Sequence, residues 1–311
     1  MQVNPRARHK LIELASKPEV VFQPSEGHEW MSRSVAFHKL VEDRLFFSAK
    51  SALGRWQIGV ADVDHIVKNP KKVELVGEGG QFFEAMTPNV VRTPDRFIMA
   101  FAGKKSRFDR RGIFLAVSDD LVGPFEVTGQ SYLPNRPWEG RSIDLGPGNL
   151  TNGERVLFFY SSAFPRFRQV ASGFLRSPFI PTPMNMMRYE ERRIGILEVD
   201  GREPFSMKGS SNPLPLECTP GALSESVFCP GYAVVDRIHM LFMACSNYSR
   251  GFPFEQSIGV AESDRPPTEW EARQPIRPLI TSKDLPAPFS HQAALDAPDA
   301  VVNSEGSVRL Y

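Results

Sequence analysis

Short apolar segments recur along the chain in groups, and each group begins with a polar turn. In the clearest group, residues 87–91 lead into the apolar segments 96–103 and 112–119, and Gly123 and Pro124 open a further segment. Apolar segments of this length, bounded by Gly, Pro, Asn and Asp, are typical of β-strands. The pattern therefore predicts a repeating unit of about four strands.

The unit returns along most of the chain. Its other copies are residues 34–37 with 44–49 and 57–62, residues 148–150 with 155–160 and 193–198, residues 226–228 with 238–244, 257–263 and 269–271, and residues 298–302 with 307–311. A period of about 50 to 80 residues with about four strands per unit is typical of a β-propeller, in which each unit is one blade. We expect an all-β, five-bladed β-propeller forming a single domain over residues 1–311, with blades at about 29–78, 79–135, 136–215, 216–285 and 286–311.

The last copy has too few strands for a blade, so the ring needs another segment to close it. The N-terminal residues 1–28 have no other repeat partner. We expect residues 10–14 and 19–22 to supply the outer strands of the fifth blade, which removes an open sheet edge. A short helix over residues 5–14 on the outside is an alternative, and both can hold.

The overall charge and the cysteine content exclude several classes of function. Lys and Arg number 37 against 36 Asp and Glu, a formal charge of +1, which favours neither nucleic acid nor an anionic membrane as partner. The apolar stretch at residues 11–14 is too short for a signal peptide or a membrane span, so we expect a cytoplasmic protein. Cys218, Cys229 and Cys245 lack metal-site spacing and are expected to be free thiols.

A long insertion interrupts the third unit at residues 163–192 and is rich in aromatic, Met and Arg residues. Long loops on a rigid scaffold often carry function, so this segment is a candidate cover for a pocket. The alternative is an interface between copies of the chain, because exposed Met and Phe side chains also drive oligomer contacts.

In a propeller the innermost strand of each blade lines the axis, so the starts of these strands converge on one end of the channel. The residues at the five predicted starts are Glu29, Arg33 and Ser34; Glu84, Thr87, Pro88 and Asn89; Arg141, Ser142, Ile143 and Asp144; Ser224, Glu225 and Ser226; and His291, Gln292, Asp296 and Asp299. Convergent acids and arginines suit a small polar ligand, and this end of the axis is the predicted site.

Several motifs resemble those of the five-bladed propeller glycoside hydrolases, the arabinanase and β-xylosidase-like group, and their relatives the β-mannoside phosphorylases. The segments that carry this resemblance are residues 87–91 with 95–99, residues 118–125 with the blade-ending pattern S-x-D-L-x-G-P-F, residues 143–148, and residues 263–264 with 269–271. The resemblance spans about residues 30–311 and implies a small carbohydrate-like substrate, while the near-zero net charge gives no reason to expect a nucleic acid or membrane partner.

In that group a blade-one Asp is the general base, a blade-three Asp orients and tunes, and a blade-four Glu is the general acid. The resemblance implies that Asp144 is the tuning carboxylate and Glu225 the acid. At the blade-one position this chain has Arg33 and Ser34, and an arginine does not act as a base at neutral pH.

This departure leaves three hypotheses open. If another acid supplies the base, the protein is an unusual hydrolase; the candidates are Glu29, Glu84 and Asp299. If phosphate replaces water, no base is needed and arginines would bind the phosphate; the candidates are Arg33, Arg107, Arg110, Arg111 and Arg141. In the third hypothesis, the site binds a sugar without cleaving it or serves a recruited biosynthetic reaction.

The remaining candidates are ligand-binding residues, each with a structural alternative. Trp138 is the best candidate for stacking on a sugar, although packing within a blade is the commoner role of such residues. Asn89 lies at a strand start, and His291 matches the place where the family keeps a histidine near a cation. No cofactor is expected, with an axial cation or phosphate as the alternative, and no protein metal site is predicted.

Overall fold

The computed structural model describes residues 24, 27–64, 66–77, 80–140, 142–165, 190–219, 222–247, 256–281, 284, 295–304 and 306–311. These ranges consist mainly of β-strands joined by turns, so the all-β prediction is confirmed. No helix among the described residues is long and apolar enough to span a membrane.

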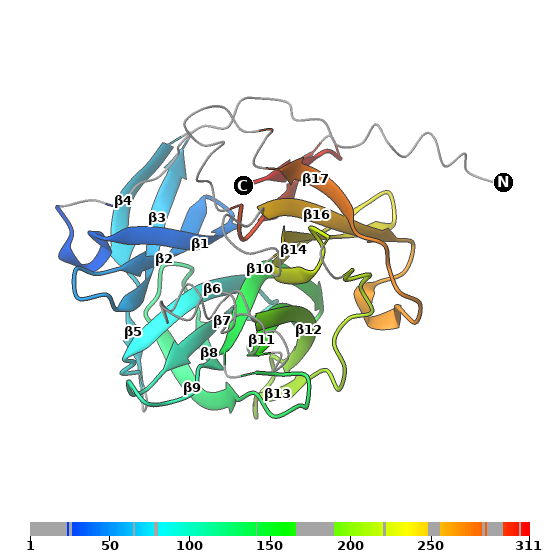
Figure 1. Cartoon of the computed structure of the whole chain (residues 1–311). Coiled ribbons are helices and arrows are strands. Elements are labelled where there is room, and N and C mark those ends of the chain that lie inside the picture. Colours follow the sequence, from blue (N-terminus) through cyan, green and yellow to red (C-terminus); the bar gives the residue numbers. More distant parts are fainter. Residues whose placement is uncertain are drawn as a thin grey trace, which may run out of the picture.

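Within the described residues, four sheets contain four or five strands each, and a fifth sheet contains two (Figure 1). The first sheet consists of β1 (Ser34–Val41), β2 (Arg44–Lys50), β3 (Trp56–Asp64) and β4 (Ile66–Lys72). The second consists of β6 (Glu84–Arg92), β7 (Phe97–Lys104), β8 (Gly112–Ser118) and β9 (Phe125–Tyr132), with β5 (Leu75–Val76) parallel to β9.

In the other three sheets, too, neighbouring strands follow one another along the chain. The third consists of β10 (Ser142–Asn152), β11 (Arg155–Pro165), β12 (Glu190–Asp200) and β13 (Ser206–Gly209). The fourth consists of β14 (Ser226–Val235), β15 (Ile238–Ser246), β16 (Gln256–Ser263) and β17 (Arg277–Thr281), and the fifth of β18 (Ala300–Val302) and β19 (Val308–Leu310). The described residues also include two short 3₁₀ helices, η2 (Glu29–Met31) before β1 and η4 (Pro267–Glu269) between β16 and β17.

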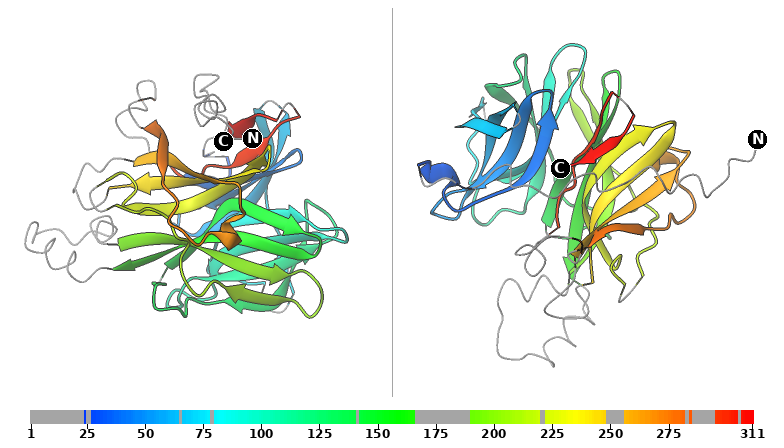
Figure 2. Two further views of the ribbon diagram at one scale, coloured as in Figure 1. Left: turned by 90° about the vertical axis from the view of Figure 1, so that its right-hand side faces the viewer. Right: turned by 90° about the horizontal axis from the view of Figure 1, so that it is seen from above.

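The first strand of each sheet lies against the first strand of the next. β1 contacts β6, β6 contacts β10, β10 contacts β14, and β14 contacts β18. The small β18–β19 sheet lies between the first and fourth sheets, where Figure 2 shows it in red between blue and yellow strands. The fold is therefore propeller-like, while the predicted closing strands at residues 10–14 and 19–22 lie outside the described residues.

The inner strands share a β-bulge near their starts, and the same backbone turn precedes β18. A non-glycine residue with positive φ occupies this turn in four blades: Phe37 (49°), Thr87 (50°), Cys229 (48°) and Ala297 (48°). In four of these five turns the chain also contains a proline: Pro88, Pro147, Pro230 and Pro298. Proline lacks an N–H and is tolerated at a bulge, whereas positive φ is strained and has to be held by packing.

Each bulge is held by the neighbouring blade. The Thr87 N–H donates to Ser48 Oγ of the first sheet at 2.7 Å. The buried Asn89 amide donates to the carbonyls of Gly146 and Gly148 at 2.7 and 3.0 Å. A Cβ atom at Gly148 would approach the backbone of Gly231 to within 2.9 Å, so only glycine allows the third and fourth bulges to nest this closely.

Asp299 completes the ring between the fifth and first sheets. Its Oδ2 accepts the Leu40 N–H at 2.7 Å, and its Oδ1 pairs with Lys39 Nζ at 3.0 Å. The Asp299 side chain is 1% exposed, so this pair lies in the interior. Among the described residues, this charge pair connects the segment before β18 to strand β1.

Apolar clusters fill the spaces between adjacent sheets. Phe46, Val90 and Phe125 lie between the first and second sheets, and Ile98 and Phe158 between the second and third. The spaces on either side of the fourth sheet are filled by Phe159, Val227, Leu241, Phe242 and Ala300. Because each fully buried large apolar side chain contributes about 1.5–3 kcal/mol, these interfaces hold the blades together.

One predicted strand is wrong. Residues 269–271 were expected to close the fourth unit, but the fourth strand there is β17, and Trp270 follows the 3₁₀ helix η4 and is buried. Pro266 and Pro267 lack the N–H groups that a strand needs at this point, which explains the helical turn.

Replacing Asp299 tests the ring closure. We expect Asp299→Ala to lower the free energy of unfolding by about 3–5 kcal/mol, because it leaves the largely buried Lys39 cation, whose side chain is 13% exposed, without its carboxylate partner. The exposed Asp264 offers a matched control, and Asp264→Ala is expected to change stability by no more than about 0.5 kcal/mol. Chemical denaturation measures both, and equal effects of the two variants would contradict the role of Asp299.

His38 at the same junction predicts a pH dependence of stability. Burial lowers the pKa of His38, and the positive charge of Lys39 lowers it further. The charges of Asp299 and Asp296 and a hydrogen bond with the Tyr311 backbone raise the pKa, but they do not offset burial. The folded state therefore favours neutral His38, while the unfolded chain binds a proton near pH 6.5. As the pH falls from 6.5 to 5.5, we expect the free energy of unfolding of the wild type to decrease by up to about 1 kcal/mol because of His38. In His38→Gln this part of the slope should vanish, and an unchanged slope in denaturation curves would rule His38 out.

Candidate functional site

Three acids predicted for the site lie where consecutive inner strands begin. Glu84 is the first residue of β6, Asp144 is the third residue of β10, and Glu225 directly precedes β14. Asp144 and Glu225 are each 7% exposed. Nearly buried acids at these positions need partners, because an unpaired charge is costly to bury.

Arg111, just before β8, connects the acids of the second and third sheets. Its Nη1 donates to Asp144 Oδ1 at 2.9 Å and to Ser142 Oγ at 3.2 Å, and its Nη2 donates to Glu84 Oε2 at 3.4 Å. Lys104 Nζ is 3.9 Å from the same Glu84 oxygen. One guanidinium thus fixes the relative positions of two carboxylates that different sheets supply.

Electrostatics at Arg111 favour its charged form. Burial works against the charge, but the charges of Asp144 and Glu84 and their hydrogen bonds outweigh burial and raise the pKa of Arg111. The cation is therefore permanent, and its two carboxylate partners neutralise it. The phosphorylase hypothesis needs arginines that can bind phosphate. Arg111 is already bound to two carboxylates, which makes it a poor phosphate ligand.

Glu225 is positioned by a second arginine. Arg193 Nη1 donates to the carbonyl oxygens of Glu225 and Arg192, each at 2.9 Å, and Arg193 also forms an ion pair with Glu191. The Arg192 N–H donates to Ser226 Oγ at 3.0 Å, which ties the start of β12 to the start of β14. The backbone carrying Glu225 is therefore fixed from the third sheet.

A further acid comes from the segment before β18. Asp296 bonds to the Cys229 thiol, and Arg192 and Asp144 are close enough to act on its charge. Burial raises the pKa of Asp296 and also raises the pKa of Cys229. Cys229 is buried and forms no disulfide, so it acts as a small apolar group with a hydrogen-bonding thiol.

The predicted blade-one residues lie away from these contacts. Ser34 begins β1 and pairs with Lys50 of β2. The exposed Arg33 donates its backbone N–H to the Lys50 carbonyl, and its guanidinium lies near the turn at Gly54. Glu29 is exposed in η2. Arg33 and Ser34 therefore contact β2 and the turn that follows it.

Three other predicted residues have structural partners. Trp138 stacks on Tyr160, with ring centroids 5.7 Å apart, and packs over Gly195 in the third sheet. Asn89 and Asp299 hold neighbouring bulges together, as described above. Arg141 and His291 lie outside the described residues, as does most of the 163–192 insertion.

Arg192, Arg193 and Glu191 were not predicted. The only sequence signal is the charged run Glu190 to Arg193 at the end of the insertion, which falls directly before an apolar strand segment. Among the described residues, no group of three or more His, Cys, Asp or Glu is arranged to hold a metal ion.

Comparison with known proteins supports the fold. No protein-family model matches the chain, and no curated protein matches it. Many solved structures resemble it, including two arabinanases and an arabinofuranosidase. An α-L-arabinanase from Penicillium chrysogenum complexed with arabinobiose is 10% identical, with a TM-score of 0.53 over 94% of this chain and 78% of that one. An endo-arabinase from Bacteroides thetaiotaomicron is 12% identical, with a TM-score of 0.51 over 94% and 92%.

The third structure, an α-L-arabinofuranosidase from Lactobacillus brevis, is 15% identical, with a TM-score of 0.50 over 92% of this chain and 78% of that one. At these identities the similarity concerns the fold. The resemblance to arabinanase-type glycoside hydrolases that the motifs indicate is therefore confirmed at the level of architecture.

Arg111 offers a direct test of the site's electrostatics. We expect Arg111→Met to lower the free energy of unfolding by about 3–5 kcal/mol, because Asp144 and Glu84 lose their shared cation. Adding Asp144→Asn should cost less than the sum of the single changes, because the two residues are directly coupled.

The exposed neighbour Arg110 is the control for this test. We expect Arg110→Met to stay within about 0.5 kcal/mol of the wild type in the same denaturation experiment. An Arg111→Met variant as stable as Arg110→Met would show that Arg111 does not stabilise the carboxylate pair.

Proposed function

We propose that this protein is an enzyme that cleaves the glycosidic bond of a small glycoside at the starts of the inner strands. The observation that carries the proposal is the set of acids Glu84, Asp144 and Glu225, supplied by three consecutive sheets and positioned by Arg111 and Arg193. The arabinanase-type fold supports this chemistry as an analogy.

Glu225 is assigned as the general acid. In an inverting glycosidase, a protonated carboxyl donates its proton to the leaving oxygen while the glycosidic bond breaks. The backbone of Glu225 is fixed by Arg193, which limits where its carboxyl can lie. Asp144 is assigned to orient the sugar and to tune the proton affinity of Glu225. The contact with Arg111 holds the Asp144 carboxylate in place for this role.

Glu84 is assigned as the general base. A carboxylate opposite the acid has to take a proton from the water that attacks the anomeric carbon. Glu84 lies beside Arg111 and Lys104 at the start of an inner strand, whereas Glu29 is exposed and Asp299 is bound to Lys39. Water thus supplies the hydroxyl of the released sugar, and the Glu225 proton leaves with the other fragment.

Phosphorolysis is the second candidate. Arg107 and Arg110 are exposed in the β7–β8 hairpin, the same hairpin that delivers Arg111 to the acids, so a phosphate could bind at the edge of the site. In this case phosphate would attack the anomeric carbon in place of water and a sugar phosphate would form.

A screen of aryl glycosides, including an α-L-arabinofuranoside, with and without phosphate tests both candidates. We expect release of the aryl group without phosphate, and a fall in kcat of about 10²–10⁴-fold in Glu225→Gln, because the leaving group loses its proton donor. The exposed Glu217 is the matched control, and Glu217→Gln should keep the wild-type rate.

Two results of the screen would redirect the assignment. Turnover that requires phosphate and yields a sugar phosphate would establish phosphorolysis instead. No turnover of any glycoside, with equal sugar binding by the wild type and Glu225→Gln, would refute the enzymatic role of Glu225.

A further inference from the structure

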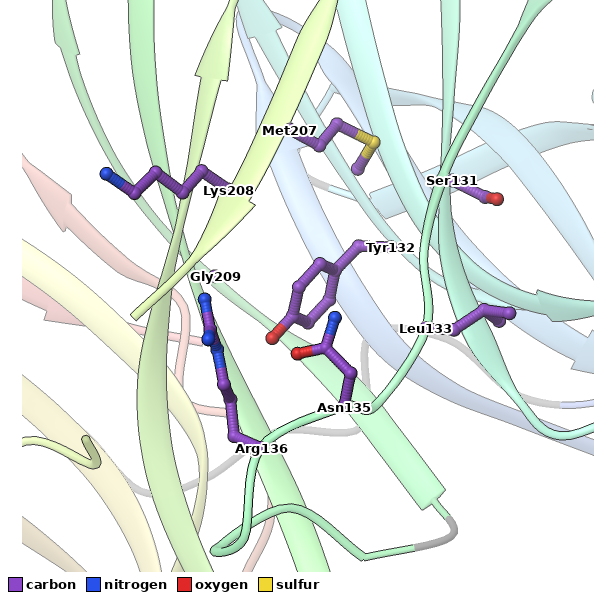
Figure 3. A pocket seen from close by; sticks show the side chains of 8 residues that line it. All are labelled: Ser131, Tyr132, Leu133, Asn135, Arg136, Met207, Lys208 and Gly209. Atoms are coloured by element: carbon purple, nitrogen blue, oxygen red, sulfur yellow. The ribbon is translucent and has the colours of Figure 1, made fainter. Parts of the chain in front are cut away.

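A cavity of about 390 Å³ lies at the outer edges of the second and third sheets, away from the inner strand starts (Figure 3). Strand β9 and the turn after it form one wall, and strand β13 forms the other. The lining residues are Ser131, Tyr132, Leu133, Asn135, Arg136, Met207, Lys208 and Gly209. Its volume lies within the range of about 300–1,000 Å³ that is typical of small-molecule sites.

The floor of this cavity is rigid. The hydroxyl groups of Tyr132 and Tyr160 donate to Glu139 Oε1 at 2.7 and 2.5 Å. The backbone N–H groups of Asn135 and Arg136 donate to Glu139 Oε2, each at 2.8 Å. One carboxylate therefore accepts four hydrogen bonds and fixes both the Tyr132 ring and the turn that carries Arg136.

The strand on the opposite wall is shaped to fit the tyrosine. A Cβ atom at Gly209 would overlap the Tyr132 hydroxyl, so glycine is required where β13 passes the ring. Burial and the bond to Glu139 raise the pKa of Tyr132 to about 12, so the hydroxyl stays protonated at neutral pH. It can donate to Glu139 and still accept a hydrogen bond from a ligand.

Arg136 is one of two cationic residues that line this cavity. Its Nε atom is buried and has no hydrogen-bond partner within the described part of the chain. In Figure 3 its guanidinium lies on the same side of the cavity as the Tyr132 hydroxyl and the Asn135 amide. A buried donor without an acceptor is costly, and a bound anion would satisfy it.

The rest of the lining favours one kind of ligand. Lys208 adds a second positive charge at the rim, and no acid is among the lining residues, while Glu139 behind them is saturated with donors. Ser131 and Asn135 offer groups that bind hydroxyls, and the Met207 and half-exposed Leu133 side chains give a limited apolar surface.

We propose that this cavity binds a small polyhydroxylated anion, such as a sugar phosphate or a sugar acid. Arg136 binds the anionic group through charge-assisted hydrogen bonds, and Asn135 and Ser131 bind the hydroxyl groups. This site is separate from the acids at the strand starts, so the proposal does not depend on the proposed glycosidase activity.

Titration calorimetry on the full chain tests this site with three probes: glucose 6-phosphate, gluconate and glucose. We expect one or both anions to bind with a Kd of about 1 mM or lower and glucose to bind at least tenfold more weakly, because it lacks the charge. Binding of glucose 6-phosphate alone would identify a phosphate ester as the ligand class, and binding of gluconate alone a carboxylate.

Variants locate the binding. We expect Arg136→Gln to weaken anion binding at least tenfold, because a charge-assisted hydrogen bond is lost. Lys208→Glu changes an exposed side chain that folding does not need, and it should also weaken binding by repulsion. The exposed Arg273 is the control, and Arg273→Gln should bind as the wild type does.

Three outcomes would overturn the proposal. The first is that neither anion gives a binding heat at a concentration ten times the expected Kd of about 1 mM. The second is equal binding of glucose and the anions. The third is unchanged binding in both folded Arg136→Gln and Lys208→Glu, which would place the anion elsewhere on the protein.

Discussion

The whole architecture depends on a ring of strained bulges at the starts of the inner strands. Positive φ angles at Phe37, Thr87, Cys229 and Ala297 are unfavourable for these residues, and they persist because each bulge packs against the next blade. Asn89, the glycines of the third and fourth bulges, and Asp299 make these contacts. Blades joined in this way can move little relative to one another, and the ring therefore fixes the geometry at its axis.

The same ring determines which side chains meet. Because the strand starts converge, acids from neighbouring sheets would repel one another without cations between them. Arg111 lies between Glu84 and Asp144, and Arg193 holds the backbone of Glu225. Arg111 comes from the β7–β8 hairpin and Arg193 from strand β12, so residues outside the inner strands stabilise and position the acids. In the arabinanase-like arrangement proposed here, the same contacts position the catalytic groups.

The repeated strand pattern predicted the fold because alternation of apolar segments and turns is local information. It also placed Glu84, Asp144 and Glu225 at strand starts. Arg111 was predicted only as one of several phosphate ligands, because its carboxylate partners are 27 and 33 residues away and no local pattern links them. Asp299 is 259 residues from Leu40, and Trp138 packs on Tyr160 of another strand; sequence alone does not reveal such tertiary partners.

The central claim is that the inner strand starts form the glycoside site. A crystal structure of Glu225→Gln with a bound aryl glycoside tests it most directly, because the substitution should slow cleavage while leaving the shape of the site unchanged. The account predicts a sugar ring within hydrogen-bond distance of residue 225 and Asp144, with Glu84 on the opposite face of the anomeric carbon. A sugar bound elsewhere on the protein, with no contact to residue 225 or Asp144, would contradict it.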